Sequence, residues 1–302
     1  MRTAGRLPPL ARTRGTVVSR QAQRLDPNSA DLTLLQDRQV AVLGFGPVGS
    51  GHALNLRDSG VDVRVGVPAD SRAAARAEIE GILVVEAADA VRQADIVVLP
   101  ADEALDVATV APLLGALEPG DLVLVTGPEL VRDGLTVPEG VDLVLLQGIG
   151  GAHRLRDEYL DGRGVPALVA VETDASGFAW PVLTAYSQAV GALRSGALVT
   201  SVTELAAATT YAESSVHEPV QALVREGFDA LIVQGVSEEV AYLVTLHELR
   251  ARVDTALVAG FGPTQVSDRQ AAALPSRRAA AAVAHPIEAV GRRVRALMSW
   301  IR

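Results

Sequence analysis

The sequence predicts an α/β fold, with a doubly wound parallel sheet in the N-terminal part and an all-helical C-terminal part. Three observations support this prediction. Short β-branched, apolar runs alternate with helical segments between residues 39 and 172, which is typical of a parallel sheet. A glycine-rich turn follows the first run and opens a helix. From about residue 178 onward, helical periodicity replaces the strand-like runs.

The expected elements follow in order along the chain. Strands are predicted at 39–43, 61–67, 82–85, 95–99, 122–126, 143–147 and 166–172. Helices are predicted at 47–57, 72–79 and 105–117, and then at 178–194, 200–214, 216–226 and 237–258. A last amphipathic helix is predicted from apolar residues spaced three and four apart: Ile287, Val290, Val294, Leu297 and Ile301.

Composition limits the chemistry. The chain has no cysteine, and all 27 of its basic residues are arginine, which excludes thiolate nucleophiles, cysteine-bound metals and a lysine Schiff base. The net charge of -9 argues against a nucleic-acid binder. The sequence contains no apolar run long enough for a membrane span and no secretory signal, so we expect a cytoplasmic protein.

The clearest motif is the glycine-rich turn after the first strand. Its G-x-G-x-x-G pattern predicts a dinucleotide phosphate site in a Rossmann-type domain, because the glycines permit a tight turn, a close approach of the pyrophosphate and close helix packing. The motif residues expected at the cofactor are Gly44, Phe45, Gly46, Pro47, Val48 and Gly49.

The end of the second strand bears on which dinucleotide binds. No acidic residue ends that strand, but Asp70, Ser71 and Arg72 follow shortly after it. Ser71 and Arg72 are candidates to hold a 2′-phosphate, which favours NADPH, whereas Asp70 could bind a free ribose, which keeps NADH possible. Alternatively, Ser71 is only a helix cap and Arg72 a solvated residue.

Longer stretches of the chain resemble the ketol-acid reductoisomerases, NADPH- and magnesium-dependent enzymes of branched-chain amino-acid synthesis. The resemblance is carried by AVLGFGPVGSGHALNLRDSGVDVRVGV (41–67), AHRLRDEYLDGRGVPALVAV (152–171) and EEVAYLVTLHELRARVD (238–254). It implies the family's short form, with a Rossmann domain and then a knotted helical domain that forms a homodimer and completes the active site. We therefore expect the Rossmann domain at 28–185 and the helical domain at 186–302. Residues 1–27 carry six arginines and no acidic residue before Asp26, which predicts a disordered extension.

The resemblance also exposes departures at the family's magnesium ligands. One family helix carries an Asp and a Glu four residues apart, and an ungapped alignment puts Ala208 and Ala212 at those positions. A second helix offers two glutamates four apart, which fall on Val244 and Glu248. Because magnesium needs several hard oxygen ligands, one remaining carboxylate predicts that no magnesium is bound.

Other family site positions are also altered. The family's active-site His, which precedes a Gly, matches Thr126 before Gly127, and its active-site Lys matches Ile149, four residues before His153. The family's substrate-binding Ser matches Ser267. Thr126 and Ser267 are therefore candidates to orient a substrate by hydrogen bonds, and Gly127 is expected to lie at the cofactor.

Proton donors have to be sought among the remaining side chains. Glu248 is the first candidate, because a carboxyl released from metal binding can act as a general acid. Tyr211 and Glu213 lie close to the position of the lost ligands, and His217 follows Glu213 by four residues. Alternatively, Tyr211 is a packing residue, and Glu213 and His217 are solvated surface charges.

These departures favour a metal-independent, NADPH-dependent reductase that lacks the isomerase step. Such an enzyme would reduce a C=N, C=O or activated C=C bond of a small molecule in specialised metabolism, and an imine is favoured because an iminium accepts hydride without a metal. The alternatives are a non-catalytic dinucleotide-binding dimer, acting as sensor or scaffold, and an ordinary ketol-acid reductoisomerase.

Overall fold

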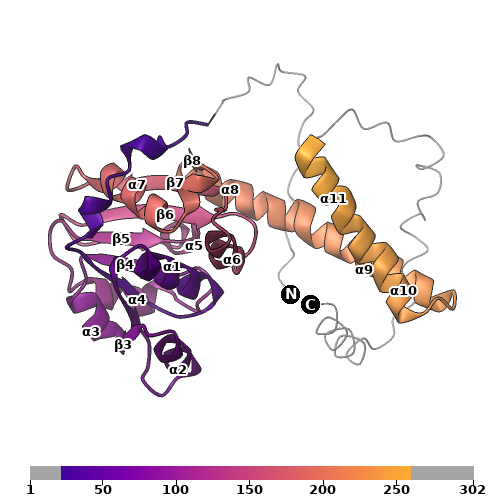
Figure 1. Ribbon diagram of the computed structural model, residues 1–302, viewed down its shortest axis with the longest axis horizontal. Coiled ribbons are helices and arrows are strands. Elements are labelled where there is room, and N and C mark those ends of the chain that lie inside the picture. Colours follow the sequence, from indigo (N-terminus) through magenta and orange to yellow (C-terminus); the bar gives the residue numbers. More distant parts are fainter. Residues whose placement is uncertain (1–21, 260–302) are drawn as a thin grey trace, which may run out of the picture. The chain divides into compact units, whose positions relative to one another are not determined.

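The computed structural model describes residues 22–259, without the side chains of residues 256–259. The chain divides into two compact units, with the boundary between Thr210 and Tyr211, and each unit is described by itself. Unit 1 holds the sheet, and unit 2 is helical in its described part (Figure 1).

Unit 1 is built on one eight-stranded sheet with the order β3-β2-β1-β4-β5-β6-β7-β8. The strands are β1 (Gln39–Val42), β2 (Asp62–Gly66), β3 (Leu83–Val85), β4 (Ile96–Leu99), β5 (Leu122–Val125), β6 (Asp142–Gly148), β7 (Ala167–Thr173) and β8 (Ala197–Val199). All neighbouring pairs are parallel except β6 and β7, which are antiparallel. The predicted doubly wound sheet is confirmed, with its last two strands, β7 and β8, running opposite to the other six.

Helices cover both faces of this sheet (Figure 1). Side chains alternate along the strands, so that in β1 Val40 and Val42 enter one core cluster and Ala41 enters the other. The first cluster is closed by α1 (Pro47–Asp58), α2 (Arg72–Ile79) and α7 (Ala179–Ala189). The second is closed by α3 (Ala87–Arg92), α4 (Val107–Leu114) and the start of α8 (Val202–Ala212).

Two further helices lie in loops that follow strands. Helix α5 (Glu129–Arg132) follows β5, and α6 (Arg154–Leu160) connects β6 to β7.

The sequence-based prediction of the sheet is wrong at two points. No strand was expected beyond residue 178, yet β8 pairs in parallel with β7. Strand β7 was expected to be parallel, but it runs antiparallel to β6. Both errors have the same cause, since strand length and apolar content do not encode the direction of pairing or the recruitment of a three-residue strand.

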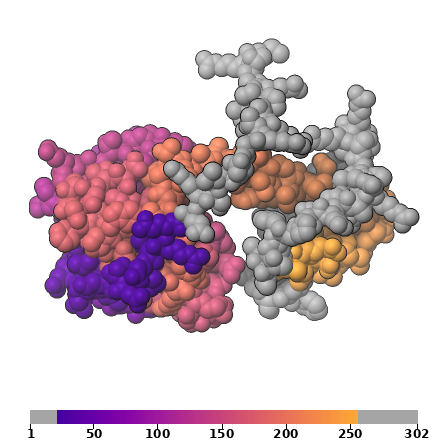
Figure 2. Space-filling view, turned by 90° about the horizontal axis from the view of Figure 1, so that it is seen from above, coloured from indigo at the N-terminus to yellow at the C-terminus, as the bar shows by residue number. Residues whose placement is uncertain are grey.

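The first described residues lie on the surface of unit 1 (Figure 2). They belong to the predicted N-terminal extension, and their backbone pairs with β8: Leu25 N donates to Ala197 O at 3.0 Å and Val199 N donates to Gln23 O at 2.7 Å. Asp26 then caps the 3-10 turn Pro27–Ser29. This short segment therefore extends the sheet edge that β8 forms.

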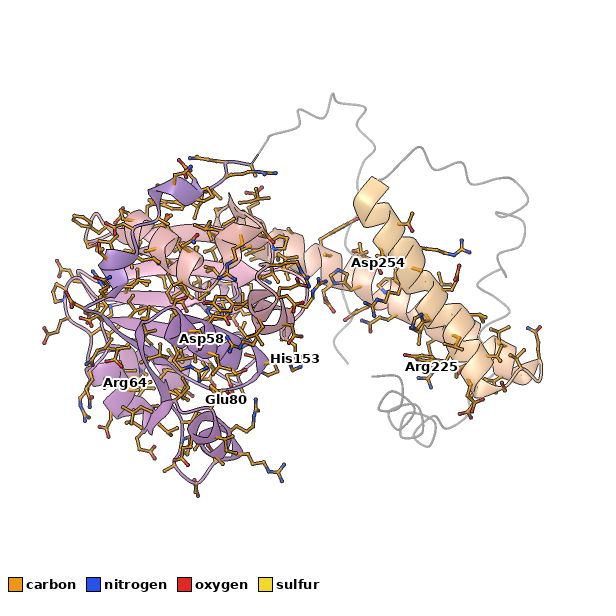
Figure 3. The ribbon with its side chains drawn as sticks, viewed as in Figure 1. Asp58, Arg64, Glu80, His153, Arg225 and Asp254 are labelled. Carbon is orange, nitrogen blue, oxygen red and sulfur yellow. The ribbon has the colours of Figure 1, made fainter. Side chains whose placement is uncertain are left out.

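Unit 2 contains helices that are interrupted by π-helical turns. Helix α8 continues through the π turn Glu213–His217 into α9 (Glu218–Val233), and α10 (Glu238–Tyr242) continues through the π turn Leu243–His247 into α11 (Glu248–Ala259). Phe228 and Ala241 are buried, whereas Arg225 on α9 is exposed and ion-paired with Asp229 (Figure 3). The helices expected from residue 200 onward are thus present as far as the described chain reaches. The last predicted helix, from Ile287 to Ile301, lies outside the described residues.

No helix between residues 22 and 259 is long and apolar enough to cross a bilayer.

Candidate cofactor and active site

The turn between β1 and α1 carries the glycine motif. Gly44 has a φ of +127°, which favours glycine and lets the chain reverse directly after β1. A Cβ atom on Gly49 would lie 2.7 Å from the carbonyl oxygen of Gly44, so a larger residue would push α1 off the turn. Pro47 stands in the first turn of α1, and Phe45 is buried. The turn therefore has the close packing that a dinucleotide motif requires.

The turn lies where the strand order reverses. The chain proceeds from β1 to β2 and β3 on one side, while β4 pairs with β1 on the other side. Ligands of doubly wound sheets bind outside the carboxyl ends of the strands at such a switch point. The turn after β1 and the loop after β4 thus face the position where a dinucleotide would lie.

Two carboxylates from the loop after β4 contact the turn. Glu103 Oε1 accepts a hydrogen bond from Gly46 N at 2.6 Å, and Asp102 Oδ2 accepts one from Val48 N at 2.8 Å. Asp102 is exposed and Glu103 is half-buried. Sequence reasoning missed both residues, although an acidic pair directly after a buried strand beside β1 was a usable indication.

The end of β5 holds the base of the same loop. Thr126 is buried, and its Oγ1 accepts a hydrogen bond from Ala101 N at 2.8 Å. Next to it, a cavity of about 40 Å³ is lined by Glu103, Gly127 and Glu129 among others. Glu129 Oε2 is buried in this region and has no hydrogen-bond partner in the described part of the chain. The structure brings Thr126 and Gly127 next to the loop that touches the phosphate turn, and their functional roles stay predictions.

The residues expected at a 2′-phosphate lie at the start of α2. Ser71 is the N-cap of α2, and its Oγ accepts a hydrogen bond from Ala74 N at 3.1 Å. Asp70 and Arg72 are exposed, and Arg72 forms no ion pair with any residue between 22 and 259. The capping role of Ser71 is therefore present, and its role at a phosphate stays a prediction.

The candidate proton donors lie in unit 2. Tyr211 is exposed, and Glu213 Oε2 lies 2.8 Å from His217 Nδ1 within the first π turn. Glu248 begins α11, is exposed and forms an ion pair with Arg252 at 3.2 Å. Glu213 and Glu248 each pair with a residue four positions along the same helical segment, and the functional roles of all these residues stay predictions.

Buried polar contacts hold helix α1 against α6 and α7. His52 Nδ1 lies 2.8 Å from the hydroxyl oxygen of Tyr186 on α7, and burial lowers the pKa of His52 from 6.5 to about 4. Asn55 donates to carbonyl oxygens at 3.2 and 3.1 Å and accepts from Arg156 at 2.8 Å. Arg156 also binds Asp58 at 2.8 Å, near the end of α1 (Figure 3). These contacts hold the helix that presents the phosphate turn.

The other positions expected from the family resemblance are Ser267, Ile149 and His153. Ser267 lies outside the described residues. Ile149 is exposed just after β6, and His153 precedes α6 (Figure 3). The position that the resemblance matches to the family's Lys is therefore an exposed apolar side chain, and its relation to the active site stays a prediction.

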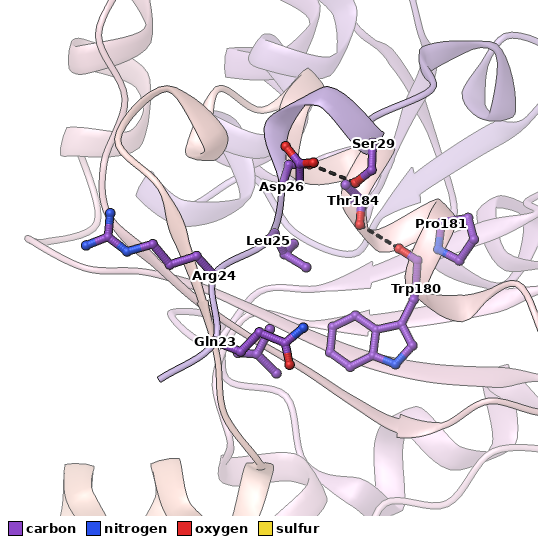
Figure 4. Close-up of a pocket in the computed structure, with 9 residues that line it drawn as sticks. Gln23, Arg24, Leu25, Asp26, Ser29, Trp180, Pro181 and Thr184 are labelled. Atoms are coloured by element: carbon purple, nitrogen blue, oxygen red, sulfur yellow. Dashed lines mark hydrogen bonds between the residues drawn. The ribbon is translucent and has the colours of Figure 1, made fainter. Parts of the chain in front are cut away.

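A separate cavity of about 540 Å³ lies between the N-terminal segment and α7 (Figure 4). Its walls include Arg24, Trp180 and Thr184, and the Thr184 hydroxyl donates to Trp180 O at 2.8 Å. None of the phosphate-turn residues lines this cavity. It is thus a different place from the candidate cofactor site.

Comparison with known proteins shows which family this chain resembles. The profile described as acetohydroxy acid isomeroreductase, NADPH-binding domain, matches residues 34–196. A ketol-acid reductoisomerase (NADP(+)) of Beutenbergia cavernae is 36% identical, covering 91% of this chain and 94% of that relative. The corresponding protein of Leifsonia xyli subsp. xyli is 40% identical, covering 75% of this chain and 67% of the relative.

Solved structures agree with this result. An NADH-preferring ketol-acid reductoisomerase from an uncultured archean has a TM-score of 0.72 and 25% identity, covering 85% of this chain and 78% of that one. An imine reductase from Pseudomonas sp. has a TM-score of 0.50 and 18% identity, covering 74% of this chain and 76% of that one, which is a likeness of fold alone.

These comparisons correct the functional prediction. The inference of a reductase without isomerase activity, and with it the preference for an imine and for specialised metabolism, is contradicted by relatives at 34–40% identity that are named for the complete reductoisomerase. The inference gave a few substituted positions, such as Ala208 and Val244, more weight than similarity along nine-tenths of the chain. The NADPH-binding domain and the recognised family are confirmed, and the chain belongs to the ketol-acid reductoisomerase family.

Proposed function

We propose that this protein is an NADPH-dependent ketol-acid reductoisomerase that acts on an acetohydroxy acid. The observation that carries the proposal is the 36% identity to a ketol-acid reductoisomerase over 91% of the chain. The glycine turn at the switch point of the sheet supports it, since this is where such an enzyme needs its dinucleotide. NADPH supplies the hydride, and the chain's contribution is to hold and orient the cofactor and the substrate.

The proposed cofactor is NADPH, with NADH as the alternative. The first amides of α1 would bind the pyrophosphate, and Ser71 and Arg72 at the start of α2 would hold the 2′-phosphate. The exposure of Arg72, and its lack of an ion-pair partner among residues 22–259, leave its guanidinium free for this role. The named preference of the archaeal relative for NADH keeps the alternative open.

Substitution of Arg72 tests this assignment. Arg72→Ala should raise the KM for NADPH about tenfold, the effect of losing one charged contact, and leave the KM for NADH unchanged. NADH is the internal control, because it has no 2′-phosphate. An NADPH preference that survives in the variant would remove Arg72 from the site.

Magnesium is the point at which this chain departs from its family. Between residues 22 and 259, no cluster of three or more His, Asp or Glu side chains could hold a metal ion. Of the four positions expected to provide carboxylates, Ala208, Ala212 and Val244 have no oxygen ligand, and Glu248 is ion-paired with Arg252. The described residues do not fit a pair of magnesium ions. We therefore propose that the described part of one chain binds no magnesium by itself.

A substrate assay tests the proposed reaction directly. The full-length protein is incubated with NADPH and 2-acetolactate over a magnesium titration, and both NADPH oxidation and the organic product are measured. We expect substrate-dependent NADPH oxidation with formation of the rearranged dihydroxy acid, one NADPH per product. Absence of turnover at every magnesium concentration, or a reduced product with an unrearranged carbon skeleton, would contradict the proposed function.

We further propose that the protein is a homodimer formed through unit 2. The support is the surface of the described helices, which leave apolar side chains exposed: Tyr211, Val216, Val220, Leu223, Val233, Val240, Leu243, Val244, Leu246 and Val253. Few side chains of these helices are buried, Phe228 and Ala241 among them. An apolar surface of this extent is typical of an interface.

Light scattering after size exclusion tests the dimer. Leu223→Glu places a charge on the exposed face of α9 and should convert the dimer into monomers. Ile79→Glu is the matched control, because Ile79 is exposed on α2 of unit 1. A monomeric wild-type protein, or a Leu223→Glu variant that remains dimeric, would contradict the proposed interface.

A further inference from the structure

The acidic loop after β4 occupies the hydrogen-bond donors that a dinucleotide needs. The first amides of a helix have no partner within the helix, and here the amides of the N-cap residue Gly46 and of Val48, in the first turn of α1, donate to carboxylates of Glu103 and Asp102. A phosphate at a helix N-terminus binds through these same amides, and the helix dipole favours either anion. The carboxylates therefore accept the hydrogen bonds of the turn's amides, as pyrophosphate oxygens would.

The two kinds of anion cannot be present together. A Cβ atom built on Gly46 would lie 2.7 Å from Asp102 Oδ2 and 2.9 Å from Glu103 Oε1, so both carboxylates lie directly over the glycine that admits the pyrophosphate. The side chain of Glu103 also covers Gly44. Since two anions at one set of amides would repel each other, the cofactor has to displace both side chains.

The loop after β4 has an anchored base and an exposed residue at its acidic tip. Its base is fixed by the hydrogen bond from Ala101 N to Thr126 Oγ1 at 2.8 Å, whereas Asp102 itself is exposed. Neither Asp102 nor Glu103 forms an ion pair with an arginine or histidine of the described chain. Displacement therefore breaks two hydrogen bonds to the turn and returns two carboxylates to water.

We propose that Asp102 and Glu103 form an intramolecular substitute for the pyrophosphate, which closes the turn of the cofactor-free chain and sets the affinity for the dinucleotide. The inference rests on dinucleotide binding as part of the proposed function, but not on the reaction that follows. Its consequence is that these carboxylates compete with the cofactor and do not contribute to its binding.

Binding measurements on the full-length protein test this competition. Asp102→Ala/Glu103→Ala should bind NADPH about tenfold more tightly than the wild type, which corresponds to about 1.4 kcal/mol. The affinity for 2′-AMP, which has no pyrophosphate, should not change. Thermal unfolding of each variant verifies that the fold is retained.

A second variant separates local competition from a general effect of charge. Glu118→Ala/Glu139→Ala also removes two carboxylates, but both belong to turns that precede β5 and β6, at the amino ends of these parallel strands. This control should bind NADPH as the wild type does. The single isosteric variant Glu103→Gln should tighten binding by less than the double alanine variant, because an amide oxygen still accepts a hydrogen bond but carries no charge.

Any of three results of these binding measurements would contradict the proposed competition. Unchanged or weaker NADPH binding in Asp102→Ala/Glu103→Ala would overturn the proposal, and so would equal tightening in the control variant or for 2′-AMP. A protein that binds NADPH but shows no turnover would contradict the proposed reaction while leaving this test intact. A turnover-competent protein whose affinity does not respond to the variants would contradict only the competition.

Discussion

The buried imidazole of His52 predicts how folding stability depends on pH. Burial lowers the pKa of His52 from 6.5 to about 4, so the unfolded chain takes up a proton at a pH where the folded chain does not. Stability is fully present above pH 6.5 and is lost as the pH falls toward 4. At about pH 5 this one group costs about 2 kcal/mol, and below pH 4 about 3 kcal/mol.

The effect can be isolated by substitution. His52→Gln keeps a hydrogen-bonding side chain but does not titrate, so all other pH-dependent groups remain common to both proteins. The difference in unfolding free energy between wild type and variant, measured with urea at about pH 7.5 and about pH 5, should change by about 2 kcal/mol in favour of the variant. The variant would therefore lose about 2 kcal/mol less stability on acidification than the wild type.

A second substitution identifies the cause. Tyr186→Phe removes the hydrogen-bond partner 2.8 Å from His52 but leaves the imidazole buried. Because burial is the reason for the lowered pKa, this variant should keep the pH dependence of the wild type. A wild type and His52→Gln variant whose stability difference stays constant within about 0.5 kcal/mol over this pH range would refute the reasoning.

Three other predictions follow from the packing of unit 1. Gly49→Ala places a Cβ atom 2.7 Å from the Gly44 carbonyl oxygen and should weaken NADPH binding about tenfold or more, measured by calorimetry. Gly51→Ala on the same helix meets only ordinary contacts, the nearest at 3.5 Å, and should leave the affinity unchanged and raise stability by about 0.5–1 kcal/mol; destabilisation would contradict the described packing. Asp142→Ala removes a buried carboxylate that accepts three hydrogen bonds from the loop after β7, including one from the Ser176 hydroxyl at 2.6 Å, and should lower the urea unfolding free energy by about 2–4 kcal/mol; a loss below 1 kcal/mol would contradict it.

Most of the sheet could be predicted from local patterns. Strand β2 (Asp62–Gly66) has valines at alternate positions, and β4 (Ile96–Leu99) is a short run of β-branched and apolar residues. Both lie between turn signals, so these patterns predict strands without reference to the rest of the fold. Strand β8 was missed because Ala197–Val199 is too short to show a pattern, and its pairing with β7 and with residues 23–25 depends on the tertiary structure.

The candidate site was likewise predictable only where its residues are adjacent in sequence. The glycines of the phosphate turn are adjacent in sequence and were therefore visible as a motif. Glu103 is 57 positions from Gly46 in sequence, and their contact arises only because β4 pairs with β1. The neutral state of His52 was equally hidden, because its burial depends on α7 packing over α1.

The π turns of unit 2 were also invisible to periodicity, and one of them has a geometric consequence for the family's metal site. In an α-helix, side chains four positions apart point the same way and can converge on one ligand. Val244 lies inside the π turn Leu243–His247, and Glu248 is the first residue after it. A π turn, which is closed by i→i+5 hydrogen bonds, has more residues per turn than an α turn, so residues four apart still lie on one side of it. A glutamate restored at position 244 would therefore lie on the same side of the helix as Glu248 without any rewinding of the turn.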